Sequence, residues 1–220
     1  MAFQESASGQ RVVKRAGVGA RGLLCLSRLR GAVAVAIIVG GALTWGAGAV
    51  RGIAVEEAPP RTGQQEVHRP RVVVIKSKRR LYLFDGEALV RSYRIALGPR
   101  AMGQKIMQGD GRTPEGLFRI CSKNKDSRYH CFLGISYPGR VAADRGLRAG
   151  LISYGEAVGI FEADEANRCP SWMTALGGGI GIHGHGTQSD WTAGCIALED
   201  EDVAELSDVL RLGDEVEILP

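Results

Sequence analysis

From residue 71 onward the sequence is a succession of short apolar runs separated by turn residues, and this pattern restricts the choice of fold. Runs such as RVVVIKS (71–77) and LYLF (81–84) are rich in β-branched and aromatic residues. Such runs, bounded by Gly, Pro, Asp or Asn, are typical of β-strands. Further candidate strands are 89–98, 117–121, 131–137, 179–183, 195–198 and 214–220. The pattern predicts a mainly β fold with a few short helices.

Helical periodicity is clear only near the C-terminus. Acidic residues at 200–202 stand where the dipole of a helix favours negative charge, and Gly213 supplies a stop signal. Between them, apolar residues recur at helical spacing. These are Val203, Leu206, Val209 and Leu210. A second helix is expected over 140–149.

The first seventy residues have a different character. Residues 31–50 form a twenty-residue run without charge, which is long enough to span a bilayer, and residues 1–30 form a basic n-region expected to stay cytoplasmic. Ala47-Gly48-Ala49 resembles a signal-peptidase site, whereas the long n-region favours a retained anchor. Both alternatives stay open. Residues 51–70 are polar and contain three prolines, which predicts a linker before a domain at 71–220. Either way the domain is expected to be exported, to the periplasm or cell envelope.

Charge gives no reason to expect a nucleic-acid partner. The chain carries a formal net charge of +4, but residues 1–51 hold seven basic residues and one acidic residue. Their surplus of +6 leaves −2 for residues 52–220. A basic segment ahead of an apolar run is a signal of membrane topology.

Export changes how the cysteines are interpreted. Apart from Cys25 in the leader, the domain contains Cys121, Cys131, Cys169 and Cys195. In an oxidising compartment thiols tend to pair unless they are kept apart or kept for chemistry. If Cys195 is reserved, one disulfide and one spare thiol become possible, and the sequence does not choose the pairing.

Two histidines and a cysteine stand out in the glycine-rich stretch GGGIGIHGHGTQSDWTAGCIALED, which covers residues 177–200. His183 falls at the end of one predicted strand, and Cys195 begins another. An imidazole can deprotonate a thiol, and backbone N–H groups near Gly194 can receive the charge of an oxyanion. The imidazole needs an orienting group, for which Asp190 or a backbone carbonyl of the glycine turn is available. The alternative is that Cys195 is an inert core residue.

Metal binding is a second alternative for the same residues. His183 and His185 are two positions apart, so they share a face of an extended strand, and Cys195 or His130 could complete a zinc site. The sequence lacks any C-x-x-C pair to support this hypothesis.

The same residues resemble the catalytic motif of the L,D-transpeptidase (YkuD) family. The family pattern is a strand-borne histidine followed by glycine or serine, then Ser/Thr-x-Gly-Cys and an apolar residue. Here it is met by IHG (182–184) and TAGCI (192–196). GDGRTPEGLFRI (109–120) resembles the family's TPEG turn, and SRYHCFLGISYPG (127–139) together with DWTAGCIALEDEDV (190–203) is similar to the YafK-like branch. The resemblance covers residues 71–220.

This resemblance implies a β-sandwich-like catalytic domain that needs neither metal nor cofactor. It implies Cys195 as nucleophile, His183 as base, with His185 as the alternative base, and the carbonyl of Gly184 as orienting group. Oxyanion donors would come from the backbone of Gly194 and Cys195. Two departures are the short connection of eleven residues between histidine and cysteine, and Leu198-Glu199 where members often carry Asn or Met.

The implied substrates are peptidoglycan stem peptides, with attack at the diaminopimelate carbonyl and release of D-alanine. A hydrolytic relative (an L,D-carboxypeptidase or an amidase) and a non-catalytic cell-wall binding module are the alternatives. Five other residues have two interpretations each, as part of the substrate path or as ordinary structural or surface residues. They are Arg128, His130, Arg145, Trp172 and Trp191.

Overall fold

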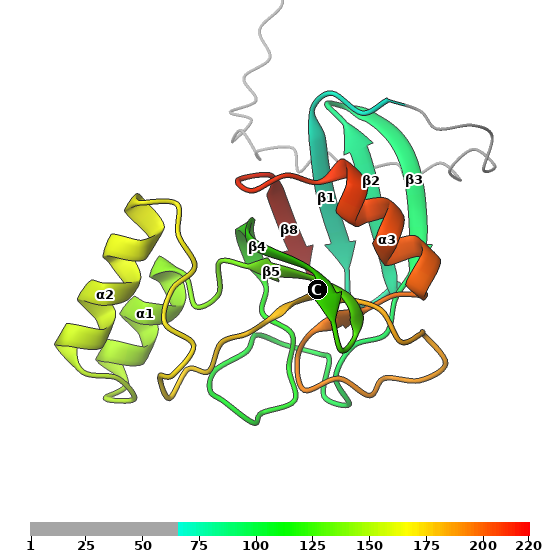
Figure 1. Cartoon of the computed structure of the whole chain (residues 1–220). Coiled ribbons are helices and arrows are strands. Elements are labelled where there is room, and N and C mark those ends of the chain that lie inside the picture. Colours follow the sequence, from blue (N-terminus) through cyan, green and yellow to red (C-terminus); the bar gives the residue numbers. More distant parts are fainter. Residues whose placement is uncertain (1–65) are drawn as a thin grey trace, which may run out of the picture. The chain divides into compact units, whose positions relative to one another are not determined.

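The computed structural model describes residues 66–220 (Figure 1). The predicted n-region, the uncharged run at 31–50 and most of the linker lie outside the described residues, so these expectations stay predictions. Across residues 66–220, none of the helices combines the length and the apolar character needed to cross a membrane.

Eight strands form a single curled sheet, in the order β3-β2-β1-β8-β4-β5-β6-β7. β1 pairs with β8 and β6 with β7 in parallel, and the other neighbours are antiparallel. Just beyond β3, Ala96 exchanges two backbone hydrogen bonds with Ala197 of β7, at 2.9 and 2.8 Å. The two ends of the sheet therefore meet. The strands are β1 (Pro70–Ile75), β2 (Arg80–Asp85), β3 (Ala88–Arg94), β4 (Gly116–Ser127), β5 (His130–Ile135), β6 (Gly181–His183), β7 (Ile196–Ala197) and β8 (Glu215–Leu219).

Alternation along the strands explains how the sheet buries its apolar residues. In β1, Val72 and Val74 point into the main core, whereas Val73 lies on the opposite face and packs with Tyr82 and Phe84 of β2. Successive side chains of a strand point to opposite faces, so an uninterrupted apolar run indicates a strand covered on both sides. The mainly β fold predicted from these runs is confirmed.

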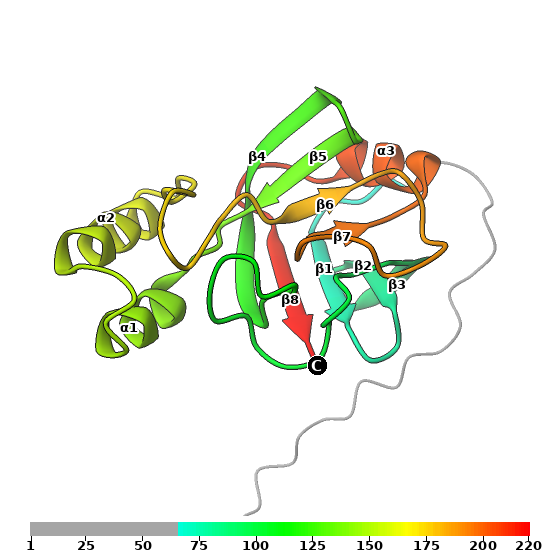
Figure 2. The ribbon, with the colours of Figure 1, turned by 90° about the horizontal axis from the view of Figure 1, so that it is seen from below.

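Three helices accompany the sheet: α1 (Arg140–Arg148), α2 (Tyr154–Glu165) and α3 (Asp200–Val209). Figures 1 and 2 show α1 and α2 packed together to one side of the sheet, while α3 packs against β5. The sequence predicted α1 and α3 but missed α2. The missed signal is a capping box, in which Ser153 accepts from the Glu156 N–H and Glu156 accepts from the Ser153 N–H.

One disulfide crosses this arrangement and settles the pairing that the sequence left open. Cys121 of β4 is bonded to Cys169, which follows α2, with 5.1 Å between their Cα atoms. Cys131 is a buried free thiol, and Cys195 is free and partly exposed. Cys195 is therefore available for chemistry.

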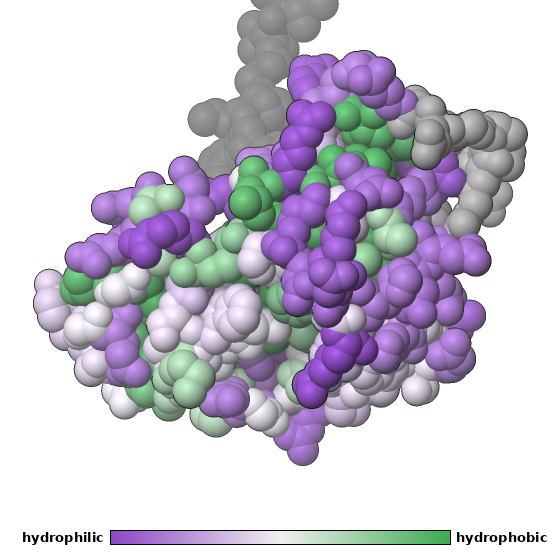
Figure 3. Space-filling view, viewed as in Figure 1, coloured by the Kyte–Doolittle hydropathy of each residue, from purple (hydrophilic) through white to green (hydrophobic). Residues whose placement is uncertain are grey.

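The surface carries scattered apolar side chains. On the face seen in Figure 3, green apolar patches are interspersed with purple hydrophilic ones. The most exposed large apolar residues of the described chain include Met173 and Val141, with exposed fractions of 91% and 78%. Isolated residues of this kind are normal on protein surfaces.

Candidate active site

The pairing of β6 with β7 brings the predicted histidine and cysteine to the same face of the sheet. In this parallel pair, His183 lies opposite Ala197. Counting back two residues on each strand places Cys195, immediately before β7, opposite Gly181. Because residues two apart share a face, Cys195 and His183 lie on the same side of the two strands. Gly181 contributes no side chain between them.

A backbone carbonyl holds the ring of His183. Its Nδ1 lies 2.8 Å from the carbonyl oxygen of Gly184. Since a carbonyl can only accept, Nδ1 carries the hydrogen and Nε2 is the nitrogen left to act as a base. A Cβ at Gly184 would collide with the Asp200 carboxylate and come within 3.0 Å of the Tyr129 carbonyl, so this position requires glycine.

Aromatic rings enclose the buried imidazole of His183. The ring of Tyr129 stacks on it with 4.8 Å between centroids, and Trp191 meets it edge-on at 5.4 Å. Arg128, one of the two arginines singled out in the sequence, lies 4.8 Å from the centre of the Tyr129 ring and donates to its hydroxyl at 2.9 Å. The Trp191 indole N–H donates to the Gly186 carbonyl at 3.2 Å.

Cys195 opens into a small cavity of about 150 Å³. Its thiol donates to the carbonyl of Gly179 at 3.5 Å, and within the described residues no hydrogen bond joins its sulfur to His183 or His185. For proton transfer to His183 the thiol has to turn away from Gly179. The cavity is lined by Lys105, Gln108, Gly109, Gly177, Gly178, Gly179, Ile180, Ala193 and Cys195.

Burial shifts the pKa values of both candidate groups toward their neutral forms. Burial raises the pKa of the Cys195 thiol above its ordinary value of 9.0, against the opposing effects of the Gly181 N–H and the charge of Lys105. Burial also lowers the pKa of His183 below 6.5; the hydrogen bond to Gly184 opposes this, and the nearby His185 adds to it. The resting pair at neutral pH is therefore a thiol and a neutral imidazole.

The turn before Cys195 is fixed by Thr192. Its hydroxyl donates to the Cys195 carbonyl at 2.7 Å and accepts the Gly194 N–H at 3.2 Å. Gly194 has a φ of +136°, and a Cβ there would lie 2.7 Å from the Arg112 carbonyl. Of the two predicted oxyanion donors, the Gly194 N–H is therefore already bonded to Thr192. The N–H of Cys195 is the other predicted donor.

The alternative base, His185, lies in a different environment. It adopts a φ of +79°, its ring is exposed, and its N–H donates to Asp200 at 2.8 Å. It lines an open groove of about 630 Å³ with Gly186, Gln188 and residues 199–201. The pairing of His183 with β7 and the carbonyl that holds its ring favour His183 over His185 as the base.

The zinc hypothesis finds no ligand set in the part of the chain that the structure describes. Across residues 66–220, no group of three or more His, Cys, Asp or Glu side chains is placed to hold a metal ion. His130 is the exposed first residue of β5, and both of its interpretations stay open.

Asp190 serves the fold rather than the imidazole. Its carboxylate accepts a bifurcated hydrogen bond from Arg79 Nε and a second hydrogen bond from Arg79 Nη2, and it also accepts the Leu97 N–H at 2.9 Å. Trp172 is 38% exposed and lies over Gly178 and Gly179, beside the cysteine cavity. Trp172 and the similarly exposed Trp191 thus flank the site and are not core residues.

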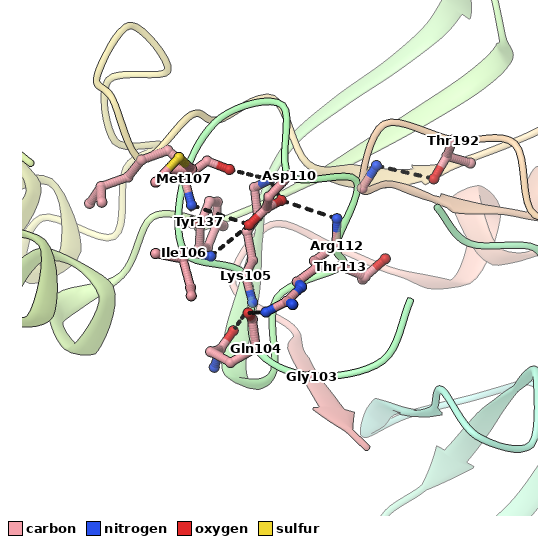
Figure 4. Close-up of polar contacts among 12 residues, drawn as sticks. Gly103, Gln104, Lys105, Ile106, Met107, Asp110, Arg112, Thr113, Tyr137 and Thr192 are labelled. Carbon is pink, nitrogen blue, oxygen red and sulfur yellow. Dashed lines mark hydrogen bonds and ion pairs between the residues drawn. The ribbon is translucent and has the colours of Figure 1, made fainter. Parts of the chain in front are cut away.

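Lys105 and Asp110, two charged residues beside the cysteine cavity, were not singled out in the sequence. Lys105 is only 2% exposed and forms an ion pair of 2.8 Å with Asp110 (Figure 4). Arg145 donates to the Lys105 carbonyl at 2.6 Å, so it supports the loop from outside. Asp110 falls in the segment 109–120 that was interpreted only as a turn, and Lys105 lies shortly before that segment.

A thiol and a carbonyl-held imidazole on one face of adjacent strands define a candidate cysteine acyl-transfer site. The family model described as the L,D-transpeptidase catalytic domain (YkuD) matches residues 69–218. The chain therefore belongs to this family. The YafK-like branch stays a prediction, and no curated protein matches the chain.

The solved structures to which the chain is similar include a cell shape determining protein and two L,D-transpeptidases. One is the helical cell shape determining protein Pgp2 from Campylobacter jejuni, at 20% identity and a TM-score of 0.47, covering 68% of this chain and 47% of that one. The L,D-transpeptidase from Xylanimonas cellulosilytica is 14% identical with a TM-score of 0.40, covering 72% and 64%. Mycobacterium tuberculosis L,D-transpeptidase 1 is 14% identical with a TM-score of 0.39, covering 69% and 62%. The chain spans about half the length of Pgp2.

Proposed function

We propose that this protein is an L,D-transpeptidase that acts on peptidoglycan stem peptides through a thioester on Cys195. One observation carries the proposal: in a chain of this family, Cys195 and His183 share a face of β6 and β7, with His183 Nδ1 held 2.8 Å from the Gly184 carbonyl. Nε2 is thereby left available for proton transfer.

Acylation begins from the neutral pair. The Cys195 thiol turns toward His183, Nε2 takes its proton, and the sulfur attacks the carbonyl between diaminopimelate and the terminal D-alanine. The Cys195 N–H receives the developing oxyanion. When the tetrahedral intermediate collapses, the C–N bond breaks and imidazolium returns the proton to the departing D-alanine amine. The product is a thioester.

Transfer reverses the same proton movement. The side-chain amine of a second stem peptide attacks the thioester carbonyl, and His183 Nε2 takes its proton. Collapse of the intermediate forms the new amide bond and breaks the C–S bond, and the proton returns to the Cys195 sulfur. If water takes the place of the amine, the same site becomes an L,D-carboxypeptidase.

Product analysis tests the proposal. We expect the wild-type protein to release D-alanine from tetrapeptide muropeptides and Cys195→Ala to release none. Mass spectrometry with and without an acceptor stem separates cross-linked dimer, the transpeptidase product, from trimmed monomer, the hydrolytic product. D-alanine release that persists in Cys195→Ala would refute the mechanism.

An exported location accompanies this proposal, because stem peptides of mature peptidoglycan lie outside the cytoplasm. Support comes from the uncharged run at 31–50 and the basic residues before it. Fractionation of cells that express the full chain should recover it from the envelope. Recovery from the cytoplasm alone would contradict export.

A further inference from the structure

The loop that precedes β4 is built around the carboxylate of Asp110. Its two oxygens accept the N–H groups of Ile106, Met107 and Arg112, at 2.7, 3.2 and 3.0 Å, in addition to the ammonium of Lys105 (Figure 4). Burial raises the pKa of Asp110, but these hydrogen bonds outweigh it and lower the pKa to about 2. Asp110 is therefore ionised at every pH at which the protein is expected to work.

Lys105 is held by this loop at the wall of the cysteine cavity. Its Nζ donates to the Met107 carbonyl at 3.1 Å and to Asp110 at 2.8 Å. An ammonium has three donors, so these two contacts leave one. Lys105 and Cys195 line the same cavity of about 150 Å³.

The other charged and titratable groups near Cys195 are placed differently. Asp110 lies behind Lys105 and is engaged by three backbone N–H groups, whereas His183 lies on the neighbouring strand and is neutral at rest. The guanidinium of Arg112 turns away to the Gln104 carbonyl, at 3.2 Å. The other residues that line the cavity are uncharged, so Lys105 is the one ionised side chain on its wall within the described residues.

We propose that Lys105 is a positioning residue whose buried ammonium stabilises negative charge in the cavity of Cys195, both on the sulfur and on an anionic group of a ligand that enters. A cavity that desolvates a thiol opposes thiolate formation, and a fixed cation nearby offsets this cost. The inference rests on the proposed function only in taking Cys195 as the reactive thiol.

Alkylation of Cys195 in the full chain tests this directly. The thiolate displaces iodide from iodoacetamide or iodoacetate, so a C–S bond forms as the C–I bond breaks. All proteins carry Cys25→Ser and Cys131→Ser, and Cys121 and Cys169 form the disulfide, so that intact mass reports Cys195 alone. In Lys105→Met we expect the midpoint, the pH at which the iodoacetamide rate is half-maximal, to rise by about one unit. At pH values below the midpoint the reaction should then be about tenfold slower. The ratio of the iodoacetate rate to the iodoacetamide rate should also fall severalfold.

Lys76→Met is the matched control. Lys76 is also fully buried and also supports this loop, because it pairs with Glu115 at 2.7 Å and donates to the Gly103 and Thr113 carbonyls. It does not line the cavity of Cys195. Lys76→Met should therefore leave the midpoint and the ratio near the wild-type values. Lys105→Arg, which keeps a positive charge at this position, should also keep both near the wild-type values.

Two results would overturn the inference: an unchanged midpoint and ratio in Lys105→Met, or equal changes in Lys105→Met and Lys76→Met. If Lys105→Met does not fold, the probe ratio of the folded wild-type protein is compared with that of the urea-unfolded protein. A ratio no higher in the folded protein would equally overturn it. Alkylation needs no peptidoglycan, so the two tests are independent. If the wild-type protein releases no D-alanine but the alkylation results are as expected, the proposed function is refuted and the role of Lys105 stands.

Discussion

The ring of Tyr129 stacks on the imidazole of His183, with 4.8 Å between their centroids and 30° between their planes. Tyr129 lies between β4 and β5, and its carbonyl also accepts the Gly184 N–H at 3.0 Å. The tip of this hairpin thus holds both the ring of His183 and the residue that orients it.

This stack predicts a measurable effect on activity. Tyr129→Ala should lower kcat/KM for D-alanine release about tenfold, because an aromatic pair contributes about 0.5–1.5 kcal/mol beyond area burial. Tyr129→Phe keeps the ring and should stay close to wild type. Steady-state kinetics at pH 7 checks both variants, and equal losses in the two would show that the hydroxyl, not the stack, matters.

The pH dependence follows from the neutral resting pair. Because the pKa of His183 is lowered below 6.5, its proton-accepting form persists below that pH, and activity is lost only as pH falls through the lowered value. We expect the acid limb of kcat/KM to be centred below pH 6.5. An acid limb centred above 6.5 would contradict this prediction.

The disulfide between Cys121 and Cys169 should stabilise the fold without taking part in the chemistry. The two residues are 48 apart in sequence, and closing a loop of this length stabilises a protein by about 4 kcal/mol in the chain-entropy account. The double variant Cys121→Ser/Cys169→Ser should unfold at lower urea concentration, whereas Cys131→Ser should change little by comparison. Alkylation of Cys195 in the folded double variant should proceed at the wild-type rate; a strong change would place the disulfide in the site.

Asp110 should make stability depend on pH in the acid range. Its pKa is about 2 in the folded protein and 3.8 ordinarily, so its contribution is complete above 3.8 and is lost as pH falls toward 2. The difference corresponds to about 2 kcal/mol. Asp110→Asn should therefore lower the free energy of unfolding at pH 6 more than at pH 2.5. Equal losses at both values would show that the carboxylate charge does not matter.

Much of the fold could be predicted from the sequence because each strand is marked by a short local pattern of apolar and turn residues. The run at 71–77 contains all of β1 except its first residue, Pro70, and the acidic residues at 200–202 mark the start of α3. α2 was missed because its buried face is made of Ala157, Ile160 and Ala163, which gives little apolar contrast along the helix. Only its capping box is visible in the sequence. The order of strands in the sheet depends on long-range pairing, which local pattern does not encode.

The site was predictable to the extent that its parts lie close together in sequence. His183, Gly184 and Cys195 fall within one glycine-rich stretch, whereas Lys105 lies ninety residues before Cys195 and reaches the cavity only through the loop around Asp110. The hydrogen bond that the Gly194 N–H donates to the Thr192 hydroxyl depends on the folded turn and could not be predicted from the sequence. Nothing in the sequence favoured Cys169 over Cys131 as the partner of Cys121.

The most direct test is the intact mass of the full chain after incubation with tetrapeptide muropeptides. We predict a covalent adduct equal to the donor peptide less D-alanine, present in the wild-type protein, absent from Cys195→Ala, and discharged when an acceptor stem is added. A wild-type protein that releases D-alanine yet never carries such an adduct, even on rapid quenching, or an adduct that persists in Cys195→Ala, would contradict a thioester on Cys195.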